Sequence, residues 1–268
     1  MDNKYVKFFE TNKETWNKKV AFHKDSDFYN VPSFLEGKTS LNSLELNELG
    51  NVNGKSLLHL QCHFGLDTLS WSRLGAKCTG IDISEEGIKQ AKVLNEKIGA
   101  NTTFIESNVY DVSENVTGQF DIVFTSYGVV GWLPDLIIWA KIIAEKLVKG
   151  GVFYMAEFHP IIWMFDYLKK PIEMAYKYSN DGAVYEEYEG TYADQKADII
   201  SKEYFWSHGL GEVITALTNA GLHIEFLHEF YESPYDCLPN MIKNENGNYV
   251  FKDSKNLFPM LYSIKATK

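Results

Sequence analysis

The chain has 268 residues, 45% of them hydrophobic, and a formal net charge of −10, from 36 acidic and 26 basic side chains. This length and apolar content suit one α/β domain with an insertion. The acidic balance, without a basic patch, argues against a nucleic-acid partner, and no apolar run is long enough for a membrane span.

The N-terminus lacks the pattern of a secretory signal. The three cysteines, Cys62, Cys78 and Cys237, form no CxxC pair and suit a reducing compartment. We therefore expect a cytoplasmic protein that works without a membrane or nucleic acid. The sequence leaves the oligomeric state open.

Residues 1–50 are polar with scattered aromatic side chains and predict one or two short helices, because Pro32 and Gly37 interrupt any long helix. From residue 55, short apolar runs alternate with helical stretches. This alternation predicts a mostly parallel sheet with helices on both faces and a ligand at the carboxyl ends of the strands. Strands are expected at 56–60, 77–83, 102–107, 120–127 and 152–158, and helices at 66–75, 85–99 and 134–148, with a turn at 149–151.

Residues 159–206 do not continue the alternation of strands and helices. They predict an insertion, first a helix or loop and then two or three antiparallel strands. A helix at 210–221 and strands at 222–230 and 259–267, antiparallel to each other, then close a seven-stranded, doubly wound α/β sheet. We expect a single domain in four parts, namely an N-terminal helical cover (1–50), a cofactor-binding half (51–158), a substrate insertion (159–206) and the closing helix and strands (207–268).

The stretch LLHLQCHFGLDTL (57–69) runs from a buried strand into a helix with a single glycine, Gly65. A strand, a tight loop, a helix and a second strand ending in Asp82 form the order that an adenosine site needs. The loop offers backbone N–H groups at a helix N-terminus, and the carboxylate accepts ribose hydroxyl protons. Asp82 follows Gly65 at close to the roughly 20-residue spacing of such sites. Ser84 already serves as the helix N-cap.

Two other interpretations of this loop are weaker. HLQCH has the histidine spacing of the zinc motif HExxH, but Leu60 replaces the glutamate and the stretch predicts a strand and loop. His59 is then a hydrogen-bonded core residue, and we expect no metal. A dinucleotide needs glycines where Gln61 and His63 stand, because side chains there crowd its pyrophosphate.

The chain resembles class I S-adenosylmethionine-dependent methyltransferases in five motifs that occur in the family's order. LLHLQCHFG (57–65) corresponds to the first motif, commonly VLDLGCGTG, and the others are GIDIS (80–84), ESNV (106–109), FDIV (120–123) and LVKGG (147–151). The whole chain is similar to a bacterial subgroup with an HLQCHFG-type first motif and a late LGEVITAL helix.

The resemblance implies the Rossmann-like methyltransferase fold and S-adenosylmethionine as cofactor. It places Gln61, Cys62, His63 and Gly65 near the methionine moiety, Asp82 on the ribose hydroxyls with Ile83 beside it, Asn108 and the Val109 N–H on the adenine, and Ser126 and Tyr127 beside the sulfonium.

Three positions depart from the family pattern. His59 stands where the first motif usually has an acid, and Gln61 and His63 replace two glycines. Glycine permits positive φ and a close ligand approach. Either this loop runs at ordinary φ angles, or Gln61 and His63 tolerate strain. Separately from this choice, each side chain is a candidate for a contact with the methionine end of the cofactor.

Methyl transfer is a displacement at carbon that needs alignment and a dry site, and sometimes a base, so we expect no catalytic triad. The candidate proton acceptors are His159, at the end of the fifth strand, and His208, with His23 as a cover residue on the substrate side. Aromatic residues that form either a substrate lid or simply the core of the insertion are Tyr29, Trp132, Trp163, Phe165, Tyr204 and Trp206.

These features predict a methyltransferase for a small-molecule acceptor, by direct displacement, with the accepting atom open among O, N, S and C. The alternatives are a non-catalytic protein that binds S-adenosylmethionine, an NAD-dependent oxidoreductase, and an RNA or protein methyltransferase, against which the acidic balance argues.

Overall fold

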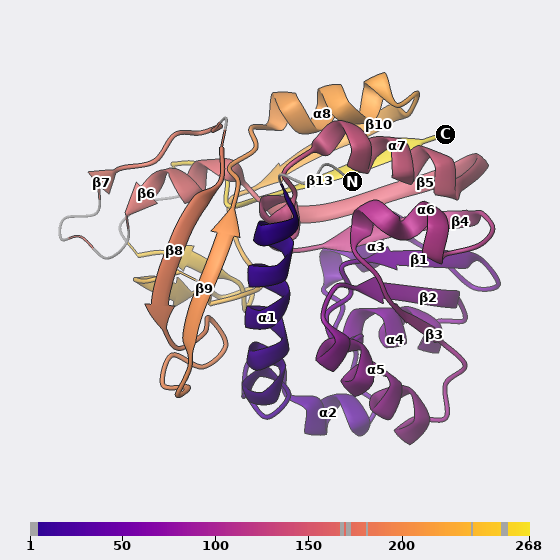
Figure 1. Cartoon of the computed structure of the whole chain (residues 1–268), viewed down its shortest axis with the longest axis horizontal. Coiled ribbons are helices and arrows are strands. Elements are labelled where there is room, and N and C mark those ends of the chain that lie inside the picture. Colours follow the sequence, from indigo (N-terminus) through magenta and orange to yellow (C-terminus); the bar gives the residue numbers. More distant parts are fainter. Residues whose placement is uncertain (1–4, 167–168, 170–172, 181, 237, 253–256) are drawn as a thin grey trace.

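The computed structural model describes residues 5–166, 169, 173–180, 182–236, 238–252 and 257–268, so that Cys237 lies outside it. Its centre is a seven-stranded sheet in the order β10-β13-β5-β4-β1-β2-β3 (Figure 1). The predicted fold class, a mostly parallel, doubly wound sheet, is confirmed. The five parallel strands are β1 (Ser56–Leu60), β2 (Lys77–Asp82), β3 (Thr103–Glu106), β4 (Phe120–Ser126) and β5 (Leu147–Phe158). The strand β13 (Leu261–Thr267) runs antiparallel to β5 and to the edge strand β10 (His223–Phe230), so that β10 points in the same direction as the five parallel strands.

The strand order reverses at β1, which pairs with β2 on one side and β4 on the other. In a parallel sheet the crossover loops diverge at such a point and leave room for a ligand at the carboxyl ends. The leucines of β1, Leu57, Leu58 and Leu60, are fully buried, so this strand is fixed by core packing on both faces.

Helices cover both faces of the sheet. On one face, Trp139 of α7 (Leu136–Lys146) and Leu217 of α8 (Leu210–Asn219) share a core with the strands. On the other, Leu49 of α3 (Ser43–Leu49) and Trp71 of α4 (Leu66–Arg73) do so. The helix α5 (Glu85–Lys97) begins at Ser84, whose hydroxyl accepts the Gly87 N–H at 3.0 Å, as predicted for an N-cap. The short α6 (Val112–Asn115) precedes β4.

The prediction for the N-terminal segment was wrong in one respect. Residues Val6–His23 form a single helix, α1, of 18 residues, and α2 (Val31–Leu35) and α3 follow it. Pro32 lies in the first turn of α2, where proline is tolerated, and so begins a helix instead of interrupting one. The buried face of α1 includes Asn12, Thr15, Lys19 and His23. Because these are polar, an apolar stripe could not reveal the helix.

The insertion after β5 starts with a 3₁₀ turn (Pro160–Met164) and two antiparallel strand pairs. The pairs are β6 (Phe165–Asp166) with β7 (Glu173–Met174) and β8 (Val184–Glu189) with β9 (Ile200–Phe205). A short hairpin of β11 (Met241–Lys243) and β12 (Tyr249–Phe251) was not expected from the sequence. The turn expected at 149–151 lies inside β5, where the pairing with β4 shifts register.

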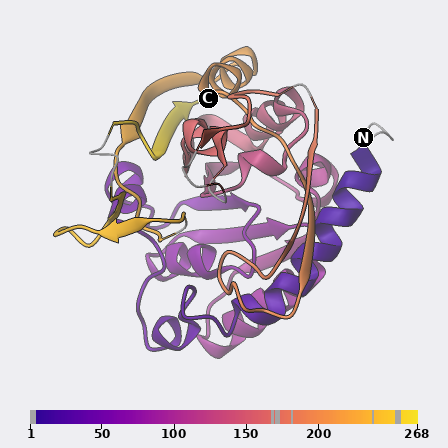
Figure 2. The ribbon, with the colours of Figure 1, turned by 90° about the vertical axis from the view of Figure 1, so that its left-hand side faces the viewer.

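The helix α1 runs between the carboxyl edge of the sheet and the β8–β9 hairpin, as Figures 1 and 2 show from two directions. The side-chain amide of Asn12 both donates to the Tyr204 carbonyl and accepts the Tyr204 N–H, each at 2.8 Å. The Thr15 hydroxyl donates to the Lys202 carbonyl at 2.7 Å. The N-terminal cover and the insertion therefore form one structure over the sheet edge. In the part of the chain that is described, no helix is long and apolar enough to cross a membrane.

Candidate active site

A cavity of about 830 Å³ opens at the carboxyl ends of β1, β2 and β4, beneath α1 and the β8–β9 hairpin. Small-molecule sites usually occupy roughly 300–1,000 Å³, so one space of this size can hold a nucleoside-type cofactor together with an acceptor. Every residue that the sequence placed at the cofactor lines it: Gln61, Cys62, His63, Gly65, Asp82, Ile83, Asn108, Val109, Ser126 and Tyr127.

The loop after β1 adopts left-handed backbone conformations at three positions. The φ angles are 57° at Gln61, 52° at His63 and 84° at Gly65. Glycine is essential at Gly65, because a Cβ atom there would lie 2.7 Å from the Phe104 ring. Of the two possibilities that the sequence left open, the structure has the strained one. A left-handed conformation costs about 1–2 kcal/mol at a residue with a Cβ atom, and such strain concentrates at functional sites.

Side-chain contacts hold this strained loop in place. The Gln61 Nε2 donates to the Val129 carbonyl at 3.1 Å, which ties the loop to the segment after β4. The His63 Nε2 lies 3.0 Å from the Nδ1 of His23 at the end of α1. The Gln61 Oε1 and the His63 Nδ1 are buried and have no hydrogen-bond partner within the described chain.

Asp82 ends β2 beside this loop and is 9% exposed. Its carboxylate accepts the N–H groups of His63 and Ser84, each at 2.8 Å. Burial raises the pKa of Asp82 to about 6, although these backbone donors oppose the shift. Nearby, the Asn108 Oδ1 accepts the Tyr110 N–H at 3.1 Å, so the side chain expected at the adenine also caps a 3₁₀ turn.

The segment after β4 is organised by a residue that the sequence did not single out. The buried Glu157 of β5 accepts the N–H groups of Gly128, Val129 and Val130 at 2.5, 2.7 and 3.0 Å. Burial raises the pKa of Glu157, and the backbone donors oppose this. Tyr127 enters the segment with φ of 22°. Glu157 therefore fixes the wall that includes Tyr127 and receives Gln61.

The N-terminal cover, the segment after β4 and the insertion each bring aromatic side chains to the cavity. Tyr29, Trp132, Trp163 and Trp206 line it, as does Phe165, whereas Tyr204 is not among the lining residues described. The placement fits a lid over the site, but Trp206 is also buried, so it serves the core of the insertion as well.

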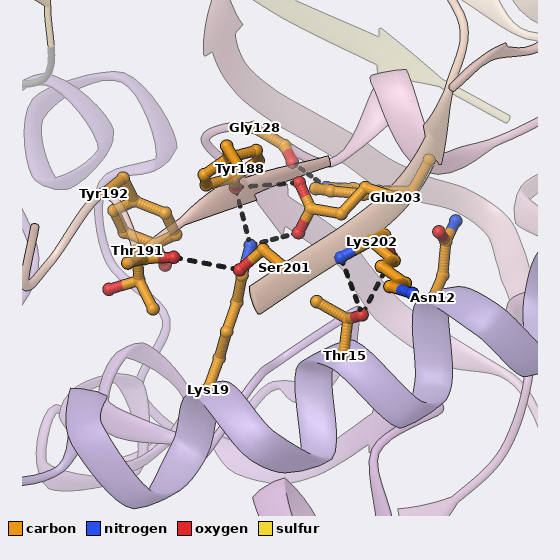
Figure 3. A network of polar contacts seen from close by, with 12 residues as sticks. Asn12, Thr15, Lys19, Gly128, Tyr188, Thr191, Tyr192, Ser201, Lys202 and Glu203 are labelled. Carbon is orange, nitrogen blue, oxygen red and sulfur yellow. Dashed lines mark hydrogen bonds and ion pairs between the residues drawn. The ribbon is translucent and has the colours of Figure 1, made fainter. Parts of the chain in front are cut away.

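A buried ion pair between two residues that line the cavity joins α1 to β9, in the network of Figure 3. The Lys19 ammonium donates to the Glu203 carboxylate and lies 3.1 Å from the Tyr188 hydroxyl. Rings of four residues surround the ammonium with centroids 4.9–5.9 Å away: Trp16, Trp132, Tyr188 and Tyr192. Burial lowers the pKa of Lys19, and Glu203 opposes this shift. No local pattern could reveal the pair, because 184 positions separate its members.

The three histidines named from the sequence lie in different environments. His208 lines the cavity, and its Nε2–H donates to the Leu133 carbonyl at 2.7 Å. His159 is 5% exposed, accepts the Ile161 N–H at Nδ1 and places its Nε2 2.9 Å from Glu229. Neither His159 nor His23 is among the described residues that line the cavity. The described residues include no group of three or more His, Cys, Asp or Glu side chains arranged to hold a metal.

Residues 58–153 match the protein-family model described as "Methyltransferase domain". This segment is a methyltransferase domain.

Solved structures agree with the domain's fold. The chain superposes on an S-adenosylmethionine-dependent methyltransferase from Mesorhizobium loti with a TM-score of 0.58 at 19% identity, covering 87% of this chain and 100% of that one. With the DhpI-SAH complex the TM-score is 0.59 at 15% identity, covering 97% and 96%. The fold thus extends beyond the matched methyltransferase domain into the cover and the insertion.

Among curated relatives, the ubiquinone biosynthesis O-methyltransferase of Shewanella pealeana is 26% identical over 121 residues. The match covers 44% of this chain and 51% of that protein, so the chain spans about half the length of this relative. The HLQCHFG subgroup stays a prediction.

Proposed function

We propose that this chain transfers the methyl group of S-adenosylmethionine to a small-molecule acceptor by direct displacement. One observation carries the proposal: a single cavity joins the motif residues of the methyltransferase domain to an aromatic wall built by the cover and the insertion. A site enclosed by Trp132, Trp163 and Trp206 suits a compact acceptor better than a polymer. The name of the Shewanella pealeana relative, a ubiquinone biosynthesis O-methyltransferase, also supports a small-molecule acceptor.

The polar groups of the cavity fit the cofactor. Asp82 offers carboxylate oxygens to ribose hydroxyls, and the Gln61 Oε1 is a buried acceptor without a partner in the described chain. The side chains of Gln61 and His63 would crowd a pyrophosphate, but S-adenosylmethionine contains none. When bound, it supplies a methyl group already activated by the sulfonium.

The residues of the chain then align the reactants and exclude water. Ser126 and Tyr127 form the wall where β4 ends, and Glu157 holds the backbone that follows them. The aromatic residues close the acceptor side. Alignment of this kind accounts for several kcal/mol of a displacement barrier. His208 is the histidine of the wall to test as a proton acceptor. Because its Nε2–H donates to Leu133, the neutral ring has its lone pair at Nδ1, which lies 3.5 Å from Glu212.

The first test is a thermal-unfolding scan with S-adenosylmethionine, S-adenosylhomocysteine and NAD in parallel. A ligand at about 100 times its Kd stabilises by roughly 2.7 kcal/mol, which raises the Tm by several degrees. We expect a shift with both sulfur compounds and none with NAD. A screen of small amines, phenols, thiols and carboxylates for release of S-adenosylhomocysteine follows. Stabilisation by NAD alone, or tight cofactor binding without turnover of any acceptor class, would contradict the proposal.

A further inference from the structure

Asp67 is a cavity residue that the sequence motifs do not account for. It lies in the first turn of α4, directly after the strained loop, and lines the cavity. Its Oδ1 accepts the Ser40 hydroxyl at 2.6 Å, and its Oδ2 accepts the Ser126 hydroxyl at 3.1 Å. Asp67 therefore joins the cover, α4 and the end of β4 at the cofactor end of the cavity.

This carboxylate has no positively charged partner in the part of the chain that the structure describes. Burial raises the pKa of Asp67, and only the two serine hydroxyls oppose the shift. Asp67 is half-buried. A carboxylate that is largely removed from water and has no cation beside it is unfavourable unless a ligand provides the compensating charge. The first turn of a helix stabilises an anion to a small extent, but it does not replace a direct ion pair.

Two other polar atoms of residues that line the same cavity lack partners within the described residues. His59 is 2% exposed and lines the cavity; its Nδ1 bonds the Thr68 hydroxyl at 2.8 Å, and its Nε2 has no partner. The Gln61 Oε1 is likewise buried and has no hydrogen-bond partner within the described residues. His59 occupies the first-motif position where an acid is usual, so the loop itself contributes no negative charge there. The nearest acid of that segment is Asp67, which follows His59 by eight positions and lies in the first turn of α4.

We propose that Asp67 binds the ammonium group of the cofactor's methionine moiety, and that Ser40 and Ser126 hold its carboxylate in place for this contact. The negative charge that the first-motif position lacks is thus supplied from α4. The inference rests on the proposed function for the identity of the ligand, and it concerns one end of that ligand only.

The test compares three ligands by isothermal titration calorimetry on the full chain. S-adenosylhomocysteine has the ammonium, S-adenosyl-4-thiobutyrate lacks only that group, and 5′-methylthioadenosine lacks the whole amino-acid part. The variant Asp67→Asn keeps the shape and an oxygen acceptor for a serine. We expect it to weaken S-adenosylhomocysteine binding at least tenfold and to change the affinity for the other two ligands less than twofold.

The matched control is Asp121→Asn at the opposite end of β4, where the carboxylate accepts the Ser56 N–H at 2.8 Å. It should leave all three affinities unchanged. An unchanged affinity of Asp67→Asn for S-adenosylhomocysteine, or an equal loss for all three ligands, would overturn the inference, the second outcome marking Asp67 as architectural. If the wild-type chain binds none of the three, the proposed function itself fails, a result distinct from any difference between variants.

Discussion

The Nδ1 atom of His23 lies 3.0 Å from the Nε2 atom of His63, so the last residue of α1 directly contacts the loop after β1. Burial, with Lys19 as a second cause, lowers the pKa of His23 to about 3. Burial also lowers the pKa of His63 well below its usual range. The pair is therefore two neutral imidazoles, one donating to the other, and it packs the cover onto a loop whose backbone is strained at His63.

Because His63 is strained, we expect glycine to be more stable than alanine at this position, the reverse of the usual order. Both His63→Ala and His63→Gly remove the ring and its contact with His23, but only alanine keeps a Cβ atom at a φ of 52°. Since the left-handed conformation costs about 1–2 kcal/mol and glycine loses about 0.4–1 kcal/mol through its freer unfolded chain, we expect glycine to be more stable by roughly 0.5–1 kcal/mol. Urea denaturation of the two variants measures the difference.

The matched position for that comparison is Lys89, exposed in the middle of α5. There the order should reverse, with Lys89→Ala more stable than Lys89→Gly by about 1 kcal/mol, because glycine is unfavourable inside a helix. The same order at both positions would show that His63 is not strained in solution.

Asp82 should be essential for cofactor affinity. A charge-assisted hydrogen bond contributes roughly 1.5–3 kcal/mol, so Asp82→Ala is expected to weaken S-adenosylhomocysteine binding at least tenfold in a calorimetric titration. Asp121→Ala removes a carboxylate that also accepts a backbone N–H, but it lies at the far end of β4. It should lower the free energy of unfolding and leave the affinity unchanged. An unaltered Kd for Asp82→Ala would remove Asp82 from the site.

The raised pKa of Asp82 predicts a pH dependence of binding. Its ordinary value is 3.8, and burial raises it to about 6 in the folded chain. The ribose hydroxyls need the charged carboxylate, so the affinity for 5′-methylthioadenosine should fall as the pH drops below about 6. For the free protein the sign is opposite: the folded state holds this proton more tightly, so Asp82 lowers stability as the pH rises from 3.8 to about 6. Titrations between pH 5 and 8 should show a smaller dependence for Asp82→Asn.

The parts of the site that could be predicted from the sequence are those fixed by local order. Asp82 and the loop after β1 follow from a strand, a loop, a helix and a second strand. The position of His159 at the end of β5 was also visible, but the chain turns at Pro160, and His159 caps this 3₁₀ turn with its ring toward Glu229. Strand periodicity could not predict where the His159 ring points, because the turn that follows the strand sets its direction.

The conformation of Gln61 and the position of α1 could not be predicted, because both depend on distant contacts. Positive φ at Gln61 is compatible with its sequence only once the Val129 carbonyl and the packed cover are in place. The face that α1 buries is partly polar, and its partners are more than 180 positions away. Asp67 was visible as an acid in a first helical turn, but that position is also explained by the helix dipole alone.

The Lys19–Glu203 pair should dominate the docking of α1 onto the insertion. Because the side chains are 1% and 8% exposed, Lys19→Met leaves a buried carboxylate without its cation, and we expect a loss of about 3 kcal/mol in the free energy of unfolding. The double variant Lys19→Met/Glu203→Gln removes both charges and should recover at least half of that loss, as urea denaturation would measure. Lys202→Met, which breaks the exposed pair with Glu187 at 3.8 Å, is the control and should change stability by less than about 0.5 kcal/mol. If the single and double variants are equally unstable, the aromatic packing around the Lys19 stem, and not the ion pair, holds the helix.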